Sequence, residues 1–133
     1  MSVDEFYFHR RRGLGRWERI GHPLDTCSFL IPVAIALFFK PESMAFWSFV
    51  GVALFSCLFV TKDEFVHSQE CDSKENWLHA VLFTLHPICL FAIYNLWLLD
   101  QQLSLSVFFL VTLGFGIYQT VSWNFTAAKR MDF

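Results

Sequence analysis

Ionisable residues gather between Asp63 and His86, in a stretch of 24 residues that lies between long apolar segments. The stretch holds five carboxylates, three of the chain's five histidines and one of its four cysteines. Ionisable groups at or below a membrane surface are energetically costly, so such a cluster needs a compensating interaction. A bound metal ion is the first explanation to consider.

The carboxylates and histidines of this stretch recur at helical spacing. Residues three or four apart share one face of a helix, which pairs Glu64 with His67 and Glu75 with His79. His86 follows His79 by seven residues, two turns further along the same face. The Glu-x-x-His spacing has the form found in carboxylate-bridged di-metal bundles. Mixed oxygen and imidazole ligands suit zinc, iron or manganese, so we predict a divalent transition metal, zinc or iron.

A third His–carboxylate pair precedes the first apolar segment and is expected to complete the site from another helix. Its members are His22 and Asp25, although Asp25 could instead cap that helix. Glu64 and Glu75 are the predicted catalytic groups, because a carboxylate beside a metal-bound water can act as a general base. The predicted metal ligands are His22, Asp25, Glu64, His67, Glu75, His79 and His86.

Several of these residues also have purely structural interpretations. His86 could be a neutral imidazole bonded to a backbone carbonyl, or to a serine or threonine of another helix. Glu75 could be a first-turn acid that the helix dipole favours. Asp63 and Glu64 could form a solvated helix end balanced by Lys62. The spacing alone leaves these alternatives open.

The composition predicts the elements that hold these groups. Of 133 residues, 55% are hydrophobic, 17 are phenylalanine and only 17% are charged. A bilayer core of about 30 Å needs roughly 20 helical residues, so the two shorter apolar runs should extend into polar residues. Because the connections are short, we predict an all-α membrane protein: one domain over residues 1–133, forming a four-transmembrane-helix antiparallel bundle. Its spans should cover about 22–39, 45–61, 77–99 and 103–123.

The distribution of lysine and arginine predicts the orientation. With four spans, both termini and the 62–75 connector share one side, which carries nine basic residues against Lys40 alone on the other. Positive residues favour the cytoplasmic side, so the N- and C-termini are predicted to be cytoplasmic. The basic arm over 1–21 then acts as a topology anchor, or holds anionic lipid headgroups. The nine residues are Arg10, Arg11, Arg12, Arg16, Arg19, Lys62, Lys74, Lys129 and Arg130.

Two classes of function fit this pattern. The first is a metal-dependent enzyme that acts on a membrane lipid or lipid-soluble substrate, by hydrolysis with zinc or by oxidation with iron. The second is a non-enzymatic membrane subunit, or a protein that handles a metal, haem or protons. A nucleic-acid partner is not expected, because no basic groove with interleaved aromatic residues follows the arm. The oligomeric state stays open.

Overall fold

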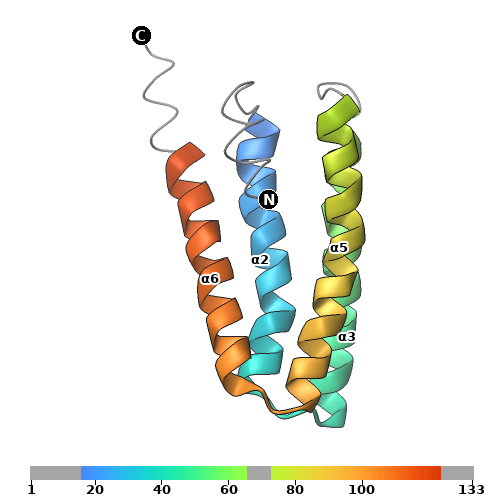
Figure 1. The fold of residues 1–133 in the computed structure, drawn as a ribbon, viewed down its shortest axis with the longest axis vertical. Coiled ribbons are helices and arrows are strands. Elements are labelled where there is room, and N and C mark those ends of the chain that lie inside the picture. Colours follow the sequence, from blue (N-terminus) through green and yellow to red (C-terminus); the bar gives the residue numbers. More distant parts are fainter. Residues whose placement is uncertain (1–15, 66–72, 124–133) are drawn as a thin grey trace.

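The computed structural model describes residues 16–65 and 73–123, and the regular structure within these ranges is helical. The helices lie side by side in one elongated bundle (Figure 1). Their bounds are Arg16–Phe38 for α2, Ser43–Phe59 for α3, Val60–Asp63 for the 3-10 helix η2, Ser73–Leu98 for α5 and Gln102–Val121 for α6.

Four helices among the described residues are long and apolar enough to cross a membrane. They overlap the four predicted spans, but the first begins earlier than predicted, because α2 already includes the polar residues from Arg16 onwards. The second gains length from η2, so both shorter runs extend into polar residues. The four candidate spans are Trp17–Phe38, Ser43–Asp63, Ser73–Leu98 and Gln102–Val121, of 22, 21, 26 and 20 residues.

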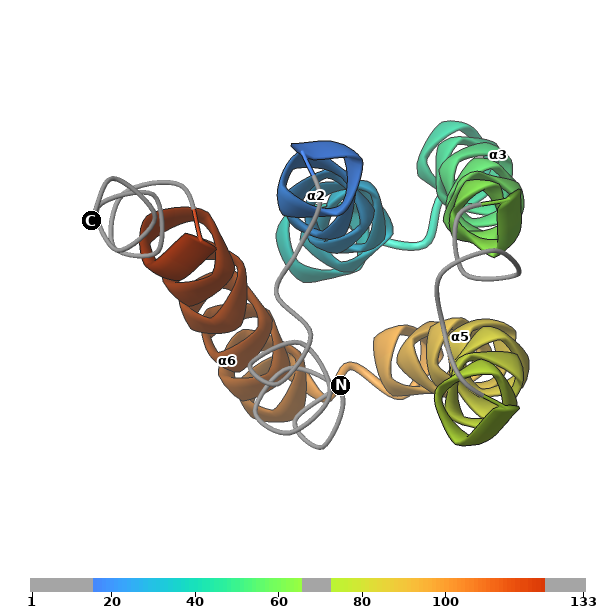
Figure 2. The same cartoon turned by 90° about the horizontal axis from the view of Figure 1, so that it is seen from above.

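Helix α2 is central in the bundle. Seen from above, it lies between α6 and α3, with α5 beside α3 (Figure 2). The most extensive packing joins α2 to α6 and α2 to α3. Helices α5 and α6 come together at their short connection and separate toward their other ends (Figures 1 and 2). The axes of α5 and α6 therefore diverge away from that connection.

The apolar core lies near the connections at residues 39–42 and 99–101. Close packing of large and small side chains stabilises this end of the bundle. The indole Nε1 of Trp97 donates to the backbone oxygen of Phe39 at 2.7 Å and ties α5 to the end of α2. The core residues are Val33, Ala36, Phe49, Leu90, Ile93, Trp97 and Leu105.

A tight turn joins α5 to α6. Asp100 has a positive φ of 52°, a left-handed conformation that aspartate tolerates better than most residues. Its backbone N–H donates to the oxygen of Trp97 at 3.1 Å, and that of Gln101 donates to the oxygen of Leu96 at 2.9 Å. These two bonds form a Schellman motif, which satisfies the last carbonyls of α5. Helix α6 can therefore start immediately, at Gln102.

Helices α2 and α6 approach each other closely at Gly116. A Cβ atom at this position would lie 2.9 Å from Cγ2 of Thr26. Small residues permit such close contacts between membrane helices, where packing supplies much of the association energy. The glycine therefore sets the distance between α6 and the central helix.

Candidate functional site

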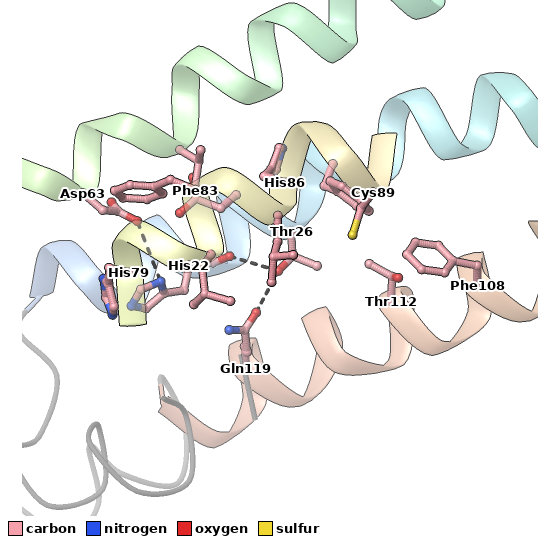
Figure 3. Close-up of a pocket in the computed structure, with 15 residues that line it drawn as sticks. His22, Thr26, Asp63, His79, Phe83, His86, Cys89, Phe108, Thr112 and Gln119 are labelled. Carbon is pink, nitrogen blue, oxygen red and sulfur yellow. Dashed lines mark hydrogen bonds and ion pairs between the residues drawn. The ribbon is translucent and has the colours of Figure 1, made fainter. Parts of the chain in front are cut away.

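Three chemically active side chains meet at the end of the bundle away from the apolar core. His22 and Asp25 come from α2, and Asp63 comes from the end of η2. Each offers one ligand atom, and these atoms all lie within 4.8 Å of one another. His22 Nδ1 is 3.9 Å from Asp63 Oδ2 (Figure 3). We call His22, Asp25 and Asp63 the His–Asp group.

Local helix geometry brings these residues together. His22 and Asp25 are three residues apart on α2 and so share a face. After Phe59 the chain tightens from α3 into η2, where each residue turns by about 120° rather than about 100°. Asp63 ends this tighter turn with only 4% of its surface exposed. Asp63 is therefore an interior residue and not the solvated helix end that its neighbours in sequence suggested.

Lys62 joins the two carboxylates of the His–Asp group. Its Nζ lies 2.6 Å from Oδ1 of Asp25 and 2.9 Å from Oδ1 of Asp63. The same ammonium lies 4.5 Å from the centre of the Phe59 ring. Such charge-assisted hydrogen bonds are stronger than neutral ones. Lys62 thus holds the Oδ1 atoms of both aspartates and leaves their Oδ2 atoms for other partners.

The charges around Lys62 do not balance while His22 is neutral. If both carboxylates are ionised, they face one ammonium, which leaves one negative charge without a counterion among the residues that the structure describes. Asp25 is 9% exposed, and its buried Oδ2 has no hydrogen-bond partner among the residues that the structure describes. Burying a charged oxygen without a partner is costly. The arrangement therefore favours an additional cation or a proton beside this oxygen.

Gly21 leaves the space that this ion cluster occupies. A Cβ atom at Gly21 would lie 3.4 Å from Oδ1 of Asp63 and 3.6 Å from Nζ of Lys62. Both distances are ordinary van der Waals contacts, so this position packs directly against the ion cluster.

A cavity of about 270 Å³ adjoins the His–Asp group and extends between α2, α5 and α6. Its walls are mainly apolar, with His79 and His86 contributed by α5 and Gln119 by α6 (Figure 3). Binding cavities for small molecules combine such apolar walls with a few polar groups. The apolar part includes Phe29, Leu82, Phe83 and Phe108.

His86 has a hydroxyl partner from another helix, as one of its structural interpretations proposed. Its Nε2 lies 3.0 Å from Oγ of Ser56, which lies 3.0 Å from Oγ of Ser28. The Ser28 hydroxyl donates to the backbone oxygen of Asp25 at 2.9 Å. This chain of hydrogen bonds crosses α5, α3 and α2. It positions the imidazole without using its second nitrogen.

Thr26 links α2 to α6 beside the cavity. Its hydroxyl lies 2.8 Å from Oε1 of Gln119 and 3.1 Å from the backbone oxygen of His22. Gln119 is 3% exposed, so the bond to it lies within the bundle. Hydrogen bonds between membrane helices are worth about 0.6–2 kcal/mol. This one fixes the separation of α2 and α6 at the cavity.

The predicted site residues fall into three places. His22 and Asp25 belong to the His–Asp group and also line the cavity, whereas His79 and His86 line the cavity only. Glu75 is buried but is not among the lining residues, and Glu64 is exposed. His67 lies outside the described residues.

Sequence reasoning missed two members of the site, Asp63 as a candidate ligand and Lys62 as its bridge. The one available signal was an apolar run that ends in adjacent opposite charges, which is common at helix ends. Its inward placement depends on η2 and on how α3 packs against α2.

No protein-family model, curated protein or solved structure matches the chain.

Proposed function

We propose that this chain is a multi-pass membrane protein with cytoplasmic termini that binds a divalent transition metal beside a cavity for an amphiphile. The observation that carries the proposal is the convergence of ligand atoms from His22, Asp25 and Asp63 within 4.8 Å. Two carboxylate oxygens and one imidazole nitrogen make a donor set that suits zinc, iron or manganese. The four apolar helices support the membrane location.

The oxygen atoms of the two aspartates divide naturally between Lys62 and a metal. Lys62 contacts Oδ1 of both residues, so the metal would take Oδ2 of Asp25 and Oδ2 of Asp63 together with His22. The buried Oδ2 of Asp25 would then gain the partner that it lacks among the described residues. Lys62 would remain as an outer partner that orients both ligating carboxylates, a common arrangement around metal sites.

The neighbouring cavity supports an enzymatic role on a lipid or lipid-soluble substrate. Its apolar walls suit a hydrocarbon chain, and its polar end adjoins the His–Asp group. A metal with three protein ligands and an open position supplies Lewis acidity to a bound substrate group. Asp25, Asp63 and His22 would position that metal, while His79 and Gln119 face the same cavity. Hydrolysis with zinc and oxidation with iron are both compatible with this donor set.

Metal analysis tests the proposal directly. Protein purified in mild detergent without chelators should contain about one equivalent of a transition metal, or take it up on titration, when measured by mass spectrometry of the elements. Asp25→Asn, Asp63→Asn and His22→Gln should each lower the metal content, because each removes one ligand. Glu42→Gln is the matched control, since Glu42 is exposed at the opposite end of the bundle. Wild-type protein that neither contains nor binds a transition metal would contradict the proposal.

The variant Glu64→Gln distinguishes the His–Asp group from the ligand set that the residue spacing in the sequence predicts. Glu64 is exposed, so this change should leave the metal content unaltered if the His–Asp group is the site. A loss comparable to that in Asp63→Asn would favour the spacing-based set, which includes Glu64 and His67. Gel filtration of each variant checks that the protein remains folded.

Proton handling is a second candidate function, favoured by the charge imbalance around Lys62. A proton on His22 would supply the missing positive charge, at 3.9 Å from Asp63. Metal-free protein in liposomes should then conduct protons, as measured with an enclosed pH-sensitive dye, and His22→Gln should abolish the flux. If the wild type carries no proton flux but binds stoichiometric metal, proton handling is excluded and metal binding remains as the function.

A further inference from the structure

The hydrogen bonds around His86 form a chain with one direction. A backbone carbonyl can only accept, so the Ser28 hydroxyl donates its single proton to the oxygen of Asp25. Ser28 must then accept from Ser56, and Ser56 must accept from Nε2 of His86. All three contacts are hydrogen bonds at once only if Nε2 carries a proton. His86 is therefore the donor that begins the chain, and the backbone of Asp25 supplies the acceptor that ends it.

Ser56 is the residue at which the chain joins three helices. Its surface is 0% exposed, and its hydroxyl on α3 lies 3.0 Å from both Ser28 of α2 and His86 of α5. Serine and threonine hydroxyls in helices often bond instead to a backbone oxygen of their own helix, as Thr84 does. A hydrogen bond accepted from His86 polarises the Ser56 hydroxyl and strengthens the bond that it donates to Ser28. The donor on α5 thus favours the contact between α3 and α2.

Ser56 also lies on the side of α3 that leads to the His–Asp group. The chain makes three α-helical steps from Ser56 to Phe59 and four 3-10 steps from Phe59 to Asp63. At about 100° and about 120° a step, the total is only about 60° more than two full turns, so Ser56 and Asp63 point toward the same side. Their partners on α2 agree, because Ser56 bonds to Ser28 and Asp63 lies 3.9 Å from His22. The rotation of α3 that places Ser56 against α2 therefore places Asp63 there as well.

The imidazole of His86 is itself held by α2 and α3. The ring of Phe29, the residue after Ser28, meets it edge-on with the ring centres 4.9 Å apart. The ligand atoms that lie within 4.8 Å of one another come from His22, Asp25 and Asp63, and His86 is not among them. His86 is thus tied to the helices that carry this group without belonging to it.

We propose that His86 is a positioning residue for the His–Asp group and does not bind the metal itself. By donating to Ser56, it stabilises the rotation of α3 that brings Asp63 and Lys62 to Asp25. The inference rests on the proposed function in one respect, that the His–Asp group binds a metal. It gives His86 an effect on metal affinity without a bond to the metal.

Two replacements of His86 separate a positioning residue from a ligand. Cobalt(II) is the probe, titrated into full-length protein in mild detergent and followed by its visible absorption. His86→Leu removes the donor and should weaken cobalt binding by roughly 2- to 12-fold, the effect of one hydrogen bond. His86→Gln retains a side-chain N–H for Ser56 and should restore the wild-type affinity and spectrum. An equal loss in both variants would overturn the proposal.

Ser56→Ala tests the connection between His86 and the site. It should weaken cobalt binding by a similar factor, and adding His86→Leu should cost little more, because both changes break the same chain. Ser48→Ala is the matched control, since Ser48 is an exposed serine of the same helix. Circular dichroism below the unfolding temperature checks that each variant is folded. Unchanged cobalt binding in Ser56→Ala, or full additivity with His86→Leu, would contradict the proposed role.

Nitrogen NMR of the full-length protein tests the start of the chain. With ¹⁵N-labelled histidine in bicelles, and His86→Gln to assign the signal, His86 should show a protonated Nε2. Ser56→Ala should reduce this preference, because the hydroxyl that accepts from Nε2 is lost. An unprotonated Nε2 in the wild type would also overturn the proposal.

A measurement without metal distinguishes this inference from the proposed function. Lys62→Met and Asp25→Asn form a double-mutant cycle, whose coupling energy reports how well this ion pair is placed. The coupling should be smaller in a Ser56→Ala background, because the rotation of α3 is then less well fixed. Wild-type protein that binds no cobalt but shows this loss of coupling would count against the proposed function only. Undiminished coupling in Ser56→Ala would count against this inference, with or without metal binding.

Discussion

The ammonium of Lys62 lies 2.6 Å from Oδ1 of Asp25, although 37 residues separate them in the sequence. The contact joins the central helix α2 to η2 and also brings in the neighbouring Asp63 at 2.9 Å. It lies at the end of the bundle opposite the apolar core. The ion cluster therefore links α2 to η2 at a distance from the apolar core.

Replacing Lys62 tests this contribution to stability. Lys62→Met should lower the free energy of unfolding by about 3 kcal/mol, because it leaves two interior carboxylates facing each other without a counterion. Thermal unfolding in detergent, followed by circular dichroism, measures the loss. Lys40→Met is the control, since Lys40 is exposed at the opposite end. Equal unfolding temperatures for Lys62→Met and the wild type would contradict this role.

Added metal should partly reverse the Lys62→Met defect. A divalent ion that binds the two aspartates supplies the missing positive charge and stabilises the folded state by mass action. Zinc should therefore raise the unfolding temperature of Lys62→Met more than that of Lys62→Met combined with Asp25→Asn. Identical responses of the two proteins would argue against metal binding by these carboxylates.

Two nearby glycines on α6 give a matched pair for testing helix packing. Gly116→Ala should destabilise the protein by about 1–3 kcal/mol, because its Cβ would lie 2.9 Å from Cγ2 of Thr26. Gly114→Ala meets no atom within 4 Å and should be neutral or stabilising by up to about 1 kcal/mol, since alanine favours helix. Unfolding titrations compare the two. The same effect from both changes would show that α6 does not pack closely at Gly116.

The bond between Thr26 and Gln119 should appear as a coupling energy. Thr26→Val and Gln119→Leu should each destabilise the protein, and their combination should cost less than the sum by about 0.6–2 kcal/mol. A double-mutant cycle of unfolding free energies measures this difference. Thr120→Val serves as the control partner, because its exposed hydroxyl bonds within α6. Strict additivity of Thr26→Val and Gln119→Leu would contradict the bond.

The predicted orientation has its own test. Reporters fused after Phe133 and before Met1 should both read cytoplasmic, because basic residues gather on that side of the spans. A run of added arginines next to Lys40 should weaken this preference. A reporter after Phe133 on the opposite side would overturn the assignment.

The helices could be predicted from the sequence because long apolar runs and short connections leave few alternatives. Their ends were harder to predict, since the turns of α2 before His22 are polar and carry no hydropathy signal. The described part of the helix nevertheless includes the polar residues from Arg16 onwards, which lie at the end of the bundle. Hydropathy identifies the part of a helix that suits lipid, not the full length over which the backbone stays helical.

The composition of the site was only partly predictable. His22 and Asp25 were recognised because a close His–carboxylate pair precedes an apolar run, whereas Asp63 was interpreted mainly as part of a solvated end. Its burial follows from the change to η2 and from the rotation of α3 against α2, which no local pattern encodes. The same rotation places the fully buried Ser56 against His86. The roles of Glu64, His67 and Glu75 stay predictions.

The separation of α5 and α6 away from their connection bears on which ligand concentration would govern binding. A cavity that opened between these two helices in a membrane would face acyl chains rather than bulk water. Its occupancy would then follow the mole fraction of ligand dissolved in the surrounding lipid. Dilution with extra phospholipid at a fixed total ligand concentration should empty the cavity, whereas dilution with buffer should scarcely change it.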